Sequence, residues 1–180
     1  RAWRHNHAVA VEFSSSGGMA IWLPDGTRTQ FVFDNFSGTW KAVNNQDQMT
    51  ELDGQIYQWS RLNGSTYYFN GDQLWKIVEP NGWATTYEYA NGRLVAITNA
   101  FGRKISLTYN INGDLSALQT PDGRVVSYTT DLVYGAGYPT RRLAGVIYPD
   151  GSTRKFLYEN SNFPYALTGI LDANNSRWGT

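Results

Sequence analysis

The chain has 180 residues and a formal net charge of zero, because 15 Lys and Arg balance 15 Asp and Glu. This balance argues against a nucleic-acid-binding protein, which needs a basic surface to collect phosphates. The absence of cysteine excludes disulfides and thiolate metal sites. No run reaches the roughly 18 apolar residues of a membrane-spanning helix. Aromatic residues make up 15% of the chain and charged residues only 17%, a composition that favours β structure.

Residues 1–55 are predicted to form an irregular lead-in. The opening "RAWRHNHAVAVEF" lacks the apolar segment of a signal peptide, and we expect the chain to be a fragment of a larger protein. A degenerate repeat lies near residues 18–33, where Ile21, Phe31 and Phe33 surround Gly26. Between Phe33 and Ile56 we expect a less regular pair of hairpins, since "GTWKAV" has strand character.

Residues 56–158 contain regular repeats centred on glycine. In four copies, residues stand eight and five positions before the glycine and five and seven positions after it, and all are aliphatic or aromatic except Thr130. A fixed internal period of this kind indicates a repeat architecture. The predicted structural core of the repeats consists of Leu74, Ile77, Tyr87, Tyr89, Leu94, Ile97, Leu107, Tyr109, Leu115, Leu118, Tyr128, Leu143, Val146, Phe156 and Tyr158.

The central glycines are predicted to form hairpin turns. Most of them follow Asn or Asp, and these pairs tolerate the positive φ that tight turns need. Pro precedes several of the pairs, as in "EPNG", "TPDG" and "YPDG", and fixes φ for the turn. With the weaker copies included, the predicted turn residues are Gly26, Gly64, Gly82, Gly102, Gly123 and Gly151.

The segments on the two sides of a turn differ in pattern. In "GRKISLTY", Ile105, Leu107 and Tyr109 alternate with polar residues, which predicts a half-buried strand. Before the turn, Leu94 and Ile97 are three residues apart. This spacing requires either that both faces are partly covered or that a β-bulge realigns the two side chains. A helix is the less favoured interpretation, because each run has only five or six residues and ends at glycine.

Two segments depart from the regular spacing. Residues 131–142, "DLVYGAGYPTRR", are interpreted as a loop insertion. Residues 159–180 are predicted to be a partial terminal repeat, in which Leu167 and Ile170 lead to Asn175 in place of the turn glycine.

These units predict the fold class. One hairpin buries too few apolar side chains to offset the entropy of ordering its chain, so neighbouring hairpins must stack. We expect an all-β fold in which residues 1–180 form a single array. The array is an extended, curled antiparallel sheet of sequential β-hairpins with little or no helix.

The repeat resembles the YD repeat of the Rhs family. The resemblance is carried by "NGRLVAITNAFGRKISLTYN", "NGDLSALQTPDGRVVSYTTD" and, more loosely, "RRLAGVIYPDGSTRKFLYEN". It is specific for residues 74–158 and looser outside them. The Tyr-Asp pair itself is absent, since the tyrosines precede Ala90, Asn110, Thr129 and Glu159. The closing, self-cleaving signature of Rhs cores is also absent.

The resemblance implies a structural role without enzymatic activity. In this family, strips of hairpins form a hollow shell around a C-terminal cargo, often a toxin. It therefore implies a secreted or cell-surface shell segment whose partners are the rest of its parent chain and an encapsulated toxin or effector domain. It implies no cofactor and no catalytic residue.

Two groups of polar residues are candidate sites of chemistry. His5 and His7 would share one strand face, but a zinc site needs further ligands that the spacing does not supply. Asp25, Asp122 and Asp150 could provide paired carboxylates for acid–base chemistry. Equivalent positions hold Asn, which cannot ionise, so turn formation is the preferred explanation.

The tryptophans provide the alternative functional hypothesis, a module that binds carbohydrate or cell-surface glycan. Exposed indole rings can stack on sugar rings, although these residues do not keep one register in the repeat, which favours cross-strand packing. The candidate ligand-stacking residues are Trp22, Trp40, Trp59, Trp75 and Trp83.

Overall fold

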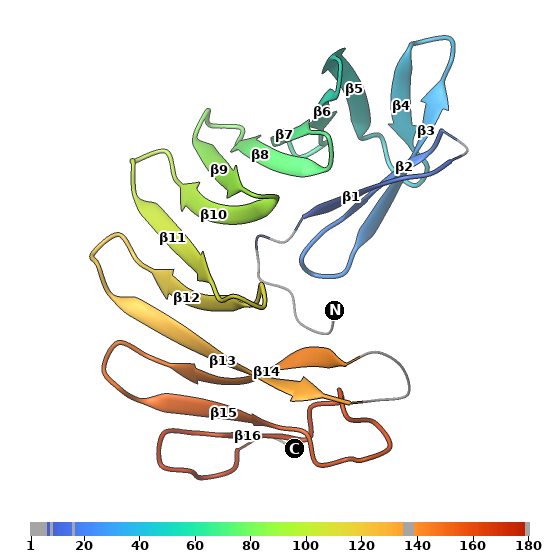
Figure 1. The fold of residues 1–180 in the computed structure, drawn as a ribbon. Coiled ribbons are helices and arrows are strands. Elements are labelled where there is room, and N and C mark those ends of the chain that lie inside the picture. Colours follow the sequence, from blue (N-terminus) through green and yellow to red (C-terminus); the bar gives the residue numbers. More distant parts are fainter. Residues whose placement is uncertain (1–6, 8, 16, 135–138, 179–180) are drawn as a thin grey trace. The chain divides into compact units, whose positions relative to one another are not determined.

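The chain is described by a computed structural model that covers residues 7, 9–15, 17–134 and 139–178 (Figure 1). These residues form strands and turns, and no helix occurs among them, so the predicted all-β fold of sequential hairpins is confirmed. For the same reason, the described residues include no helix able to cross a membrane. His5 lies outside the described residues.

The chain divides into two compact units. The N-terminal unit, Arg4–Arg103, contains β1 (Ala10–Phe13), β2 (Met19–Trp22), β3 (Arg28–Asp34), β4 (Thr39–Ala42), β5 (Gln48–Asp53), β6 (Ile56–Ser60), β7 (Thr66–Asn70), β8 (Gln73–Val78), β9 (Ala84–Ala90) and β10 (Arg93–Thr98). The C-terminal unit, which contains Lys104–Thr180, has β11 (Lys104–Tyr109), β12 (Leu115–Gln119), β13 (Val125–Val133), β14 (Thr140–Ile147), β15 (Thr153–Leu157) and β16 (Gly169–Leu171).

Within each unit, every strand pairs antiparallel with the next strand in the chain. Short turns are sufficient for this order, because no strand has to cross over another. In the N-terminal unit the sheet also curls, since β1 lies against β8. The ring of Phe13 on β1 is 5.6 Å from that of Tyr57 on β6, which shows how the curl brings distant strands together.

A β-bulge explains the three-residue spacing that precedes each regular turn. Leu94 pairs with Tyr89 and Ile97 pairs with Tyr87, so apolar residues three apart oppose tyrosines that are two apart. The extra residue bulges out of the ladder and leaves both apolar side chains on one face. The four regular repeats all have this bulge seven positions before the turn glycine, at Trp75, Val95, Ser116 and Ala144.

The six predicted turn glycines have φ values from 74° to 86°, in the left-handed region that side chains other than glycine's rarely adopt. Each glycine N–H donates a hydrogen bond of 2.8–3.0 Å to the carbonyl oxygen three residues earlier. This is the three-residue hairpin loop that closes with a left-handed glycine. Asn175, the predicted substitute in the terminal repeat, also has a positive φ of 57°.

The interpretation of residues 131–142 as a loop is wrong at both ends. Strand β13 continues to Val133, and β14 begins at Thr140. The polar residues at these ends pair across the hairpin, because Asp131 stands opposite Arg142 and accepts a hydrogen bond of 3.0 Å from its Nη2. Opposite charges on facing strands stabilise a ladder that looks like a loop in the sequence.

Candidate functional site

The predicted core residues share one side of each sheet, here called the repeat face. In the N-terminal unit Leu74 is 1% exposed and Tyr87, Leu94 and Ile97 are also buried, whereas Ile77 and Tyr89 are half-buried. In the C-terminal unit only Leu107 and Val146 of the predicted core residues are buried. The half-buried ones in that unit are Tyr109, Leu115, Leu118, Tyr128, Leu143, Phe156 and Tyr158.

Thr130, the polar exception to the repeat pattern, belongs to a hydrogen-bonded cluster. Its hydroxyl donates to Asp114 at 3.0 Å, and Arg141 contacts both residues. Burial opposes ionisation of Asp114, but hydrogen bonds from Thr130, Asn110 and Arg141 outweigh it and lower the pKa of this carboxyl. The cluster ties β13 and β14 to the turn between β11 and β12, so it stabilises the hairpins.

The turn carboxylates are engaged within their own turns. Asp25 Oδ1 accepts a hydrogen bond from the Thr27 backbone N–H at 2.8 Å, and Asp150 Oδ1 accepts one from the Ser152 N–H at 2.9 Å. Hydrogen bonds from the threonine or serine hydroxyl keep the pKa of Asp25, Asp122 and Asp150 below the ordinary value. These carboxylates are therefore ionised and lock the turns, as expected for Asx-type turns.

Three of the candidate tryptophans are held by packing or hydrogen bonds. Trp59 is fully buried, and its Nε1 donates to Asp47 at 3.1 Å. Trp22 Nε1 donates to Glu12 at 3.0 Å, and Trp40 Nε1 donates to the Gly17 carbonyl at 3.3 Å. Because Trp59 is inaccessible, the hypothesis that it stacks on a ligand is wrong.

Trp75 and Trp83 are the exposed members of the set, at 36% and 54%. Trp75 is a bulge residue that packs against Tyr68, with the Lys76 ammonium 4.8 Å from its ring centre. Trp83 meets Phe101 edge to face, with ring centres 4.9 Å apart. The two rings of this second pair are close to perpendicular, so they do not form one flat platform for a sugar chain.

His7 lies against the repeat instead of in a metal site. Its Nδ1 is 3.4 Å from the hydroxyl of Tyr87 on β9, and the two rings are 5.9 Å apart. Burial lowers the pKa of His7 and raises that of Tyr87, so both side chains are neutral at pH 7. No group of three or more His, Cys, Asp or Glu able to hold a metal occurs among the residues that the structure describes.

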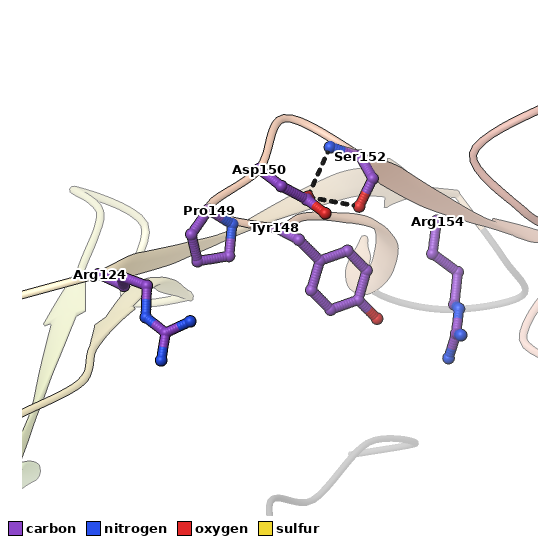
Figure 2. Close-up of a pocket in the computed structure, with 6 residues that line it drawn as sticks. All are labelled: Arg124, Tyr148, Pro149, Asp150, Ser152 and Arg154. Carbon is purple, nitrogen blue, oxygen red and sulfur yellow. Dashed lines mark hydrogen bonds between the residues drawn. The ribbon is translucent and has the colours of Figure 1, made fainter. Parts of the chain in front are cut away.

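An open pocket of about 510 Å³ lies at the turn end of the C-terminal unit, lined by Arg124, Tyr148, Pro149, Asp150, Ser152 and Arg154. Figure 2 shows the Tyr148 ring between the two arginine side chains, all three pointing away from the turn. Arg154 stands opposite Val146 in the ladder, which places the pocket on the repeat face.

Sequence reasoning missed two features. Asp47, within "NNQDQ", looks like an ordinary turn residue, yet it is buried and accepts hydrogen bonds from Trp59 Nε1 and the Leu62 N–H. The pocket had a detectable signal: Arg154 stands three residues after its turn glycine, where the other regular repeats have Thr85, Ile105 and Val126. A charged residue at a repeat position that is otherwise neutral indicates that this position has a local role outside the repeat pattern.

Comparison with known proteins agrees with the hairpin geometry. No curated protein matches the chain. Two overlapping segments, residues 70–104 and 90–125, match the RHS Repeat family. They span the strands from β8 to β12, including the bulges at Trp75, Val95 and Ser116. Residues 70–125 are therefore RHS repeats and form a structural repeat module of that type within the chain.

Proposed function

We propose that the chain is a non-enzymatic wall segment of an Rhs-like β shell that encloses or presents a secreted toxin or effector cargo. Its partners would be the rest of its parent chain and a cargo domain at the C-terminal end of that parent. The site of action would be outside the cell or at its surface.

The repeat face of the C-terminal unit is the observation that supports an enclosing role. Leu115, Leu118, Tyr128 and Phe156 remain only half-buried on this face. Apolar side chains that their own unit leaves partly open gain free energy when another molecule covers them. A cargo enclosed by the wall would supply that cover.

The polar groups support a structural role rather than catalysis. The carboxylates of Asp25, Asp122 and Asp150 are engaged by neighbouring hydroxyl groups. Asp114 is held by Thr130 and Arg141. Each of these carboxylates thus has a structural partner in its own turn or hairpin, which accounts for its presence without a catalytic role.

Protease protection of the parent protein tests the proposal. The region downstream of the repeats should resist digestion in the intact parent and be cleaved rapidly when produced alone. Leu94→Asp places an unpaired charge in the buried repeat face and should open the wall, so that the downstream region becomes sensitive. Equal digestion rates in the intact parent and in the isolated region would overturn the enclosing role.

The alternative, recognition of a cell-surface glycan, depends on Trp83, which is 54% exposed and lies beside Phe101, itself 65% exposed. A glycan array probed with the chain and with Trp83→Ala tests it directly. Binding that Trp83→Ala abolishes would establish the alternative, and the absence of binding across the array would remove it.

A further inference from the structure

The pocket at the turn end of the C-terminal unit presents cationic groups that the fold does not neutralise. The Arg154 guanidinium stacks on the Trp178 ring at 5.3 Å, and it has no ion pair or hydrogen bond among the described residues. Arg124 is paired with Asp122 through Nε alone, at 2.7 Å, so its terminal nitrogens still have donor capacity. Stacking on an aromatic ring keeps a guanidinium flat and in place without satisfying its donors.

The remaining polar groups of the pocket are the Tyr148 hydroxyl and the Asp150 carboxylate, and they differ in their hydrogen bonds. The Tyr148 hydroxyl has no hydrogen-bond partner within the described ranges, and Figure 2 shows it on the same side as the two guanidinium groups. Ser152 donates two hydrogen bonds to Asp150 Oδ1, which hold this carboxylate at the turn. The guanidinium groups of Arg154 and Arg124 and the Tyr148 hydroxyl offer donors and positive charge, which complement a carboxylate.

The surroundings favour a polypeptide over a small molecule. The pocket is open, so it cannot enclose most of a small ligand's surface, as small-molecule sites do. It adjoins the half-buried repeat face, because Arg154 lies directly opposite Val146 and two residues before Phe156. A chain lying on this face could place apolar side chains on Tyr128 and Phe156 and an acidic side chain at Arg154.

We infer that Arg154, Tyr148 and Arg124 form a carboxylate-recognition site for an acidic polypeptide segment lying along the repeat face of the C-terminal unit. Arg154 and the Tyr148 hydroxyl would hold the carboxylate, and Arg124 would attract it through charge. The inference rests on the proposed function in one respect, namely that the enclosed cargo would supply this segment.

The test is an NMR titration of the ¹⁵N-labelled chain with two synthetic peptides. In both peptides every second residue is Ser, so that the remaining, larger residues lie on one face of the extended peptide. The larger residues are Leu and Glu in the first peptide and Leu and Gln in the second. The Arg154 Nε–Hε resonance and the amides of β14 and β15 should shift with the Glu peptide. Binding should be about fivefold weaker for the Gln peptide, the size expected for an exposed ion pair.

Variants separate the site from general charge attraction. Arg154→Gln and Tyr148→Phe should each weaken the Glu peptide severalfold, to about the affinity of the Gln peptide for the unchanged chain. Arg28→Gln is the matched control, since Arg28 also stacks on a tryptophan ring, that of Trp22 at 5.5 Å, and lies in the N-terminal unit. It should leave the affinity unchanged.

Three outcomes would overturn the inference: equal binding of the Glu and Gln peptides, equal losses in Arg154→Gln and Arg28→Gln, or tighter binding of hexagalacturonate than of the Glu peptide. The last result would assign the pocket to an acidic sugar. If the protease-protection experiment fails but the Glu peptide binds as expected, the enclosing role is rejected and the carboxylate site is retained. If protection is observed but the Glu peptide does not bind as expected, only the carboxylate site is rejected.

Discussion

The two units are built from similar hairpins, yet they bury their side chains to different depths. The most deeply buried large side chains, among them Phe31, Met49, Trp59 and Phe69, all lie in the N-terminal unit. Phe31, Trp59 and Phe69 occupy repeat positions around Gly26 and Gly64, in the weaker copies of the repeat. The C-terminal unit follows the pattern more closely but has a half-buried face, and it has ion pairs such as Asp114–Arg141 and Asp131–Arg142. The repeat thus determines strand pairing, while the size of the side chains at its positions determines how completely a unit buries its core.

Trp59→Ala should have the largest effect on this difference. The indole is fully buried, packs edge-to-face on Phe31 at 6.0 Å and satisfies Asp47. Its removal should lower the free energy of unfolding of the N-terminal unit by about 3–5 kcal/mol. Urea denaturation followed by circular dichroism measures this loss. Phe36→Ala, at a fully exposed side chain, is the control, and a loss as small as that of the control would show that the core has been misidentified.

A matched pair of leucines sharpens the comparison. Leu74 and Leu115 occupy the same repeat position, but Leu74 is buried in the N-terminal unit and Leu115 is half-buried in the C-terminal unit. Leu74→Ala should cost about 2–5 kcal/mol, and Leu115→Ala about half as much, because less surface leaves water. Amide hydrogen exchange reports each unit separately. Equal losses at the two positions would remove the distinction between the units.

Two turn glycines differ in the space around them. Gly64 and Gly123 have φ values of 84° and 85°, so alanine at either position should cost about 1–2 kcal/mol of backbone strain. At Gly64 a Cβ would also lie 3.1 Å from Pro80 Cγ, whereas at Gly123 it meets nothing within 4 Å. We expect Gly64→Ala to be the more destabilising in thermal unfolding. If Gly123→Ala were the more destabilising variant, Pro80 and the turn at Gly64 would have moved apart at little cost in free energy.

Acidification should affect the two units at different pH values, with the smallest effect of this series. Burial lowers the pKa of His7 in the folded N-terminal unit, so the unfolded chain binds the proton more tightly. This unit should lose stability as the pH falls below about 6.5. Asp114 in the C-terminal unit also has a lowered pKa, and its contribution is lost only as the pH falls below about 3.9. Denaturation at pH 7.5, 5.5 and 3 measures both effects, and His7→Phe should abolish the first of them.

Much of the fold could be predicted from the sequence because the repeat encodes local geometry. The spacing of Leu94 and Ile97 already allowed a bulge, and the glycines after Asn or Asp indicated where the chain turns. The prediction failed where tertiary partners decide the outcome. Asp131 and Arg142 looked like loop residues until they were placed opposite each other.

The candidate site was less accessible to sequence reasoning. Exposure of a tryptophan depends on how far the sheet curls, so Trp59 and Trp83 could not be distinguished by pattern. The pocket combines Arg124 from one turn with Tyr148 and Arg154 around the next, and only the stacking of the two hairpins shows that they meet.

The recurring bulge has a consequence for how a sheet of these hairpins can change in length. Because each regular hairpin has its own extra residue at the same place, each one bends its strand and adds local twist in the same sense. Each copy of the repeat then determines its own curvature. Gaining or losing a copy lengthens or shortens the curved sheet without altering its radius of curvature. Duplication of a hairpin can therefore enlarge the sheet while every existing strand pairing keeps its geometry.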